Sequence, residues 1–171
     1  MSFAYAEDDR ARPIGAAVAL AVLCPVVVIA LIAAGLLYYS GSSARIANDY
    51  TAVAAPASQA LTAEVTAYSR NQRHDLAAAK SDLRREAKTE ASFDNQLAGL
   101  TFPGAASNAS AALIQADTKR IKLIGLQAQS TSLRQLRSFS SADQTTTAAV
   151  EAQVGRLRQA LGMPPSSAGG Y

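Results

Sequence analysis

The chain has 171 residues, of which 49% are hydrophobic and 17% are charged, and its formal net charge is +3. This length allows about one domain. Four Phe, six Tyr and no Trp supply little of the bulk that a β-sandwich core needs. Alanine, the strongest helix former, is abundant instead, so the composition favours an all-α fold. The charge falls far short of the dense basic face typical of nucleic-acid-binding proteins, and we expect no nucleic-acid partner.

The first feature along the chain is an uncharged segment between Arg12 and Arg45. Residues 14–39 are rich in Leu, Ile and Val, which contribute about −4 to −8 kcal/mol to membrane insertion. The segment is long enough to cross a hydrocarbon core of about 30 Å. Tyr38 and Tyr39 lie where aromatic rings favour the headgroup layer. We expect an uncleaved signal-anchor, with a transmembrane helix over residues 13–40 that contacts the lipid bilayer through residues 14–39.

The charges that flank this segment predict its orientation. Arg10, Arg12 and the amino terminus lie on one side, whereas Arg45 is the only nearby base on the other. The positive-inside rule therefore predicts a cytoplasmic segment over residues 1–12 and an extracytoplasmic domain over residues 41–162, on a single-pass protein of the plasma membrane. The alternative is a signal peptide cleaved near Ala44, but signal-peptide cores are typically only about 7–15 residues long.

Two further readings of the membrane segment depend on small residues. Cys24 could be a lipidation site, but Leu23 stands where such signals need a small residue, so we interpret Cys24 as a membrane-embedded thiol. Ala30 and Ala34 are spaced so that two anchors could pack closely as a homo-oligomer. Spacings of this kind also arise by chance in an alanine-rich segment.

From residue 45 onward, apolar residues recur at intervals of three and four, which predicts amphipathic helix. Pro56 should kink or restart this helix, because proline lacks the backbone N–H of a helix interior. The polar patch at residues 69–75 is a second place where the helix could break. The run from Gly99 to Gly104, which includes Pro103, should end the helix and turn the chain.

A second helical stretch is predicted over residues 105–139. Ser141 and Gln144 then fit a capping box, and a last helix follows. Gly162 suits its C-terminal cap, and residues 163–171 are expected to be a disordered tail. Short connections favour antiparallel neighbours, so we predict a helical hairpin or three-helix bundle with coiled-coil-like packing, or four helices if the chain breaks near residue 71.

The sequence offers few candidates for chemistry. Asp82, Glu86 and Glu90 recur every four residues among Lys and Arg, a pattern typical of a solvated helix face. His74 is the only histidine, so transition metals lack a ligand set, and its charged neighbours predict a surface position. We therefore predict no catalytic, cofactor or metal site, and a protein that is not an enzyme.

The densest basic spot contains three charges and offers a contact for an anionic partner, although a solvated surface is the simpler interpretation. Its residues are Lys119, Arg120 and Lys122.

The layout resembles the anchored helical ectodomains of bacterial sensors and envelope accessory proteins, and the small uncharacterised single-pass envelope proteins of high-GC bacteria. The resemblance covers layout and composition only and implies no site residues. We expect a membrane-anchored, non-enzymatic interaction or scaffold protein with a protein partner in the cell envelope. The alternative is an anchored binding module for a small or lipid-like ligand held between the helices. The scaffold hypothesis requires an exposed apolar stripe, and the binding hypothesis requires a cavity.

Overall fold

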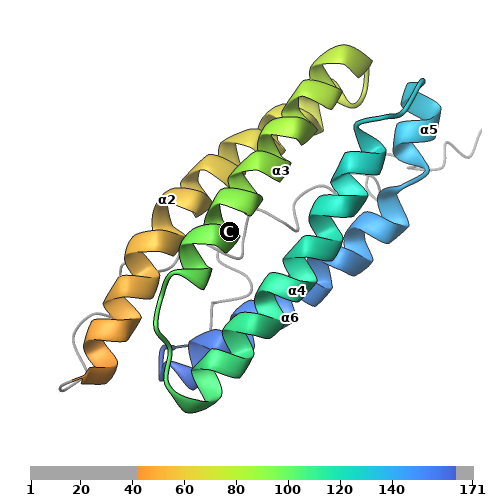
Figure 1. Cartoon of the computed structure of the whole chain (residues 1–171). Coiled ribbons are helices and arrows are strands. Elements are labelled where there is room, and N and C mark those ends of the chain that lie inside the picture. Colours follow the sequence, from red (N-terminus) through yellow and green to blue (C-terminus); the bar gives the residue numbers. More distant parts are fainter. Residues whose placement is uncertain (1–41, 165–171) are drawn as a thin grey trace, which may run out of the picture.

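The computed structural model describes residues 42–164, which are helical almost throughout and contain no strand (Figure 1). The all-α class is therefore confirmed for this part of the chain. The helices, in chain order, are α2 (Ser42–Asn71), α3 (Leu76–Ala98), α4 (Gly104–Gln127), α5 (Leu133–Arg137) and α6 (Ser140–Ala160).

The four long helices form a bundle of two antiparallel hairpins. Helix α2 packs against α3, α3 against α4, and α4 against α6 (Figure 1). The short helix α5 lies at the end of the bundle that also holds the connection between α2 and α3 (Figure 1). Residue 42 lies at the opposite end, where α3 also passes into α4.

The break near residue 71 is real, so the four-helix alternative is the one that the structure supports. Helix α2 ends at Asn71, and α3 begins after Asp75, whose side chain accepts a hydrogen bond from the backbone N of Ala78 at 2.9 Å. An aspartate in this N-cap position satisfies a backbone donor that has no partner within the helix. Pro56 was predicted to kink or restart α2. The restart does not occur, because α2 runs without interruption through Pro56.

The predicted helix over residues 105–139 is divided, which corrects the sequence-based boundaries. Helix α4 ends at Gln127, and five residues separate it from α5. The predicted capping box was also wrong. Phe139 occupies the N-cap position of α6, and no side chain caps that helix.

The predicted cap at Gly162 is confirmed. Its backbone has φ +67°, its N–H donates to Gln159 O, and Met163 N donates to Arg158 O. These two bonds form the Schellman arrangement that ends many helices.

Two separate apolar clusters form the core. One is built around Leu97, Leu113 and Leu157, near the end of the bundle where α3 connects to α4, and we call it the Leu113 cluster. The other is built around Leu83 and Ile124, near the opposite end, and we call it the Ile124 cluster. The stretch of bundle between them holds polar side chains.

The predicted membrane segment at residues 13–40, the cytoplasmic segment before it and most of the predicted tail lie outside the described residues. None of the helices within residues 42–164 combines the length and the apolarity needed to cross a bilayer.

Candidate functional site

Charged residues occupy core positions in the middle of α3. Buried residues follow each other along this helix in steps of four and three, as in a coiled coil: Ala79, Leu83, Glu86, Glu90, Asp94 and Leu97. Helix α4 shows the same spacing, with Leu113 and Ile124 on either side of two charged positions, Asp117 and Arg120. Because both helices place these residues at the same height, the charges form one buried layer between the Leu113 and Ile124 clusters.

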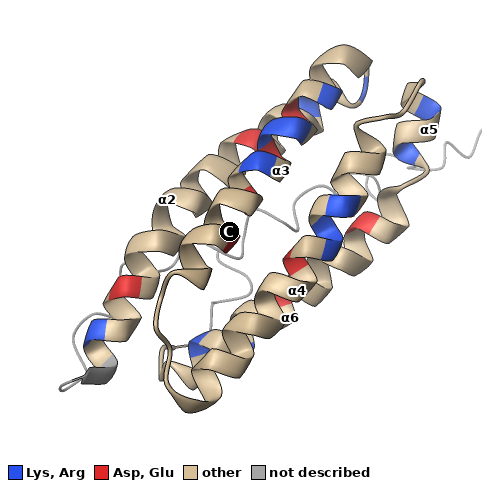
Figure 2. Ribbon diagram, viewed as in Figure 1, with Lys and Arg blue, Asp and Glu red and all other residues tan. Residues whose placement is uncertain are grey.

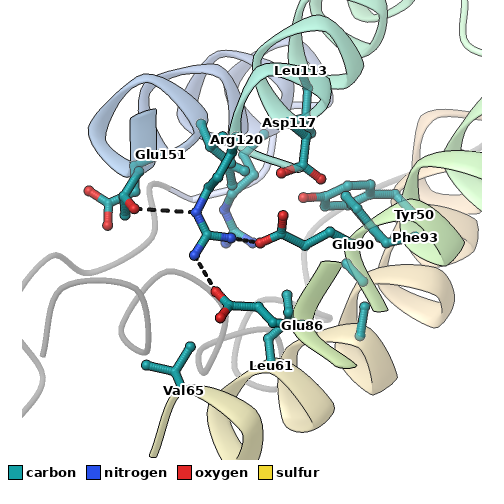
Figure 3. Close-up of a pocket in the computed structure, with 16 residues that line it drawn as sticks. Tyr50, Leu61, Val65, Glu86, Glu90, Phe93, Leu113, Asp117, Arg120 and Glu151 are labelled. Carbon is teal, nitrogen blue, oxygen red and sulfur yellow. Dashed lines mark hydrogen bonds and ion pairs between the residues drawn. The ribbon is translucent and has the colours of Figure 1, made fainter. Parts of the chain in front are cut away.

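Arg120 lies at the centre of this layer, and only 6% of the residue is exposed. Its guanidinium group forms ion pairs with the carboxylates of Glu86 and Glu90, and its Nε donates to Thr147 Oγ1 at 3.3 Å (Figure 3). Burial raises the pKa of Glu86, while the charge and the hydrogen bonds of Arg120 oppose the rise. Arg120 therefore joins α4 to α3 and α6 through charge-assisted contacts.

A second pair of carboxyl groups lies beside Arg120. Asp94 on α3 and Asp117 on α4 are both buried and are hydrogen-bonded to each other. Burial, the negative charge of Asp117 and the hydrogen bond raise the pKa of Asp94 to about 8, and burial raises the pKa of Asp117 to about 6. Two carboxylates so close cannot both ionise easily, so the pair holds one proton at neutral pH.

A cavity of about 70 Å³ lies next to this charged layer and opens between α2 and α6. The α2 wall is formed by small and aliphatic side chains, among them Ala54, Ala57 and Leu61, and the α6 wall includes Val150 and Val154. Ligand sites in proteins are typically concave and apolar with a few polar groups at defined points. This cleft has that composition, because its floor is the charged layer.

Several polar groups point into the cleft. Figure 3 shows the hydroxyl group of Tyr50 and the carboxyl groups of Glu90 and Asp117 directed toward the same part of the cavity. Burial raises the pKa of Tyr50 to about 12, although the nearby charge of Arg158 lowers it. Arg158 is itself held in place, because Nε and Nη2 both donate to the carbonyl oxygen of Pro164, at 3.2 and 2.9 Å.

Not every buried oxygen of this region has a partner. Glu90 is 2% exposed, and its Oε2 accepts no hydrogen bond; the same is true of Asp94 Oδ1. A buried polar atom without a partner costs roughly 1–3 kcal/mol. Burial also raises the pKa of the half-buried Glu151 on α6, against the effect of Arg120. The carboxyl groups of the layer thus outnumber the two guanidinium groups that face them.

The structure corrects the interpretation of Asp82, Glu86 and Glu90 as a solvated face. All three are buried. Asp82 accepts from Asn71 Nδ2 at 2.7 Å and forms an ion pair with Arg85, so it fixes the turn between α2 and α3. The overlooked signal was the spacing of four and three, which continues from Leu83 through Glu86, Glu90 and Asp94 to Leu97.

The predicted basic spot is divided by the fold. Lys119 and Lys122 are exposed, as a contact for an anionic partner requires, whereas the guanidinium group of Arg120 is buried and already paired. His74 is exposed in the turn after α2. Within residues 42–164, no three His, Cys, Asp or Glu side chains are grouped so that they could hold a metal ion.

Comparisons with protein-family models, with curated proteins and with solved structures found no match to this chain. The class that the fold defines is therefore a four-helix bundle with a short additional helix, a buried charged layer and a cleft above it. The chemistry of that cleft is the basis for any functional conclusion.

Proposed function

We propose that the chain is a membrane-anchored binding module that takes a small organic cation, an ammonium group with a short apolar body, into the α2–α6 cleft. The observation that carries this proposal is the cleft itself. Its walls are apolar, while its floor contains more carboxyl groups than guanidinium groups and the unpartnered Oε2 of Glu90.

The walls suit a short apolar group. Ala54 and Ala57 leave space on α2 that larger side chains would fill, and Val150 and Val154 face them from α6. The cavity volume of about 70 Å³ is roughly half that of a cavity known to hold benzene. A ligand that fits is therefore small, and a longer tail would extend out of the cleft between the two helices.

The charge of the floor selects for a cation. The pKa values of Glu86, Asp94, Asp117 and Glu151 are all raised, mainly by burial, so burial disfavours the ionised carboxylates. A bound ammonium group would stabilise these carboxylates and give Glu90 Oε2 a donor. The rings of Tyr50 and Phe93, which also line the cleft, add surfaces that attract cations.

The ligand-binding hypothesis comes first here, ahead of the scaffold hypothesis that the sequence favoured. Among the described residues, Leu126 is the only large hydrophobic side chain that is exposed, at 54%. A scaffold that binds a protein through an apolar stripe needs a larger contiguous patch.

Thermal unfolding of the full chain in a neutral detergent tests the proposal. Short alkylammonium ions should raise the unfolding midpoint, because their positive charge stabilises the carboxylates on the floor of the cleft. Alkyl carboxylates of the same length should leave the midpoint unchanged. The Ala57→Leu variant fills the cleft and should abolish the shift. Ala55→Leu, on the exposed face of the same helix, is the matched control and should retain it.

Two results would reject this function. One is an equal shift with ammonium ions and carboxylates, which indicates nonspecific binding of alkyl chains. The other is a shift that survives in Ala57→Leu, which places the ligand elsewhere.

A further inference from the structure

Acidic and basic residues are sorted between the inside and the outside of the bundle. Of the acidic residues in the described part of the chain, only Asp49 and Asp75 are exposed. Of the Lys and Arg residues there, only Arg120 and Arg158 are buried, and Lys80 is half-buried. The outer surface is therefore much more basic than the formal net charge of +3 indicates.

The exposed bases also gather at one end. We call this the basic end; it comprises the end of α2, the α2–α3 turn, the adjoining parts of α3 and α4, and α5 (Figure 2). Asp75 is the exposed acid there. The exposed bases on the helices and in the turn are Arg70, Arg73, Arg84, Arg85, Lys88, Lys119 and Lys122, and both arginines of α5 are exposed as well.

Two acidic residues near the basic end, Asp82 and Glu86, are buried and add no negative side chain to its surface. Asp82 is 2% exposed, and its oxygens accept from Asn71 and Arg85. Glu86 is buried against Arg120. These two carboxylates offset the charges of Arg85 and Arg120, and the other exposed bases leave this end with a positive potential, which attracts anions over several ångströms.

We propose that the basic end binds a flexible anionic polymer that carries phosphate or carboxylate groups along its length. The bases lie on four separate elements rather than around one point, so a single small anion could reach only a few of them. A chain of anionic groups can contact them together. Tyr68 and Phe139 are half-buried, so this surface lacks the exposed aromatic rings that stack nucleobases, and recognition rests on charge.

The position of the basic end favours a polymer over the headgroups of the bilayer. Helix α2 has 30 residues and therefore spans about 45 Å. The basic end lies at the far end of this helix from residue 42, where the proposed membrane anchor joins. A surface this far along the bundle from the anchor can reach components of the surrounding space, whereas the end at residue 42 is the one beside the anchor.

Binding of the full chain to polyphosphate and to poly-glutamate, followed by fluorescence anisotropy, tests this proposal. The double variant Arg84→Gln/Lys122→Gln removes two exposed charges from the basic end, and Arg45→Gln/Arg156→Gln removes two exposed charges from the opposite end. We expect roughly a tenfold loss of affinity in the first variant and less than a twofold loss in the second. Affinity should fall steeply as salt rises, and Ala57→Leu should bind the polymer unchanged because the cleft is not involved.

The outcomes separate the possibilities. Binding of only one polymer supports the proposal and identifies the anionic group. Equal losses in the two double variants overturn it, because total charge then explains the binding. Binding to neither polymer, or end-dependent binding to anionic vesicles alone, overturns it too. A second pair at the basic end, Lys119→Gln/Arg134→Gln, repeats the test should Arg84→Gln/Lys122→Gln fold poorly.

Discussion

Arg120 shows how one residue can hold three helices at a place where the core is not apolar. Its guanidinium group contacts the two glutamates of α3 and Thr147 of α6. A buried ion pair gains little net stability over well-packed apolar residues, yet removing one partner leaves the other charge buried alone. The layer is thus a position where a small change in charge has a large effect.

Replacement of Arg120 with Met should therefore destabilise the bundle strongly. We expect a loss of about 3–5 kcal/mol at pH 7, because Glu86 and Glu90 lose their cation. Urea unfolding followed by circular dichroism measures this loss. Lys119→Met, the exposed neighbour on the same helix, should change the stability by less than about 0.5 kcal/mol. Equal effects for the two variants would show that Arg120 is not buried in an ionic layer.

The Asp94–Asp117 pair predicts a pH dependence of stability. The folded state holds a proton on Asp94 up to a pKa of about 8, compared with a pKa of 3.8 for an aspartate in the unfolded chain. The pair's contribution is therefore complete below about pH 4 and falls as the pH rises toward 8. In Asp94→Asn this fall should be smaller. The free energy of unfolding of the variant, relative to that of wild type, should therefore rise by on the order of 2–4 kcal/mol between about pH 4 and pH 8.

Denaturant unfolding at several pH values between 4 and 9 measures that difference. Asp49→Asn, on the exposed surface, serves as the control and should follow the wild-type profile. A constant difference between Asp94→Asn and wild type at all pH values would contradict the shared proton.

At this scale, the sequence could have revealed the charged layer but did not identify it. Glu86 and Glu90 fall on the steps of four and three that join Leu83 to Leu97, so their positions in the core were predictable. Charged residues at such steps are normally solvated, because burial of an ion is costly without a partner. The partner, Arg120, is 34 residues from Glu86, and periodicity within one helix does not reveal which distant side chain it meets.

The elements themselves were predicted where glycine and proline punctuate the chain. The turn between α3 and α4 begins at Gly99 and leads into Gly104, the first residue of α4, whose φ of +51° is a backbone conformation that glycine adopts without strain. The break after Gln127 was missed because residues 128–132 contain neither glycine nor proline. Tertiary contacts stabilise it instead, since Ser130 is buried and its carbonyl oxygen accepts from Lys80 Nζ at 2.9 Å.

The start of α3 gives a prediction at the scale of the element. Asp75 caps this helix through Ala78 N, so Asp75→Ala should reduce the free energy of unfolding by about 0.5–2 kcal/mol. Ser81→Ala, at an exposed position inside the same helix, should cost less than this or even stabilise the helix, because alanine has the higher helix propensity. Thermal unfolding of both variants compares them. An Asp75→Ala variant with unchanged stability would contradict the role of Asp75 as the helix cap.

For the whole molecule, the membrane anchor stays a prediction from residues 14–39. We expect the full chain to remain in the membrane fraction after extraction with alkaline carbonate and to be released by detergent. A chain that lacks residues 1–41 should appear in the soluble fraction. Intact-mass measurement of the membrane-derived protein separates an uncleaved anchor from cleavage near Ala44. Release of the uncleaved full chain by carbonate alone would contradict the anchor.

The central claim is that the α2–α6 cleft binds a small organic cation on its carboxyl-rich floor. Calorimetric titration of the full chain with propylammonium at pH 8 and pH 5 tests it most directly. Because protons occupy the carboxyl groups at low pH, binding should be clearly tighter at pH 8, should release protons, and should disappear in Ala57→Leu. Binding that is equally tight at both pH values, or that persists in Ala57→Leu, would contradict the account.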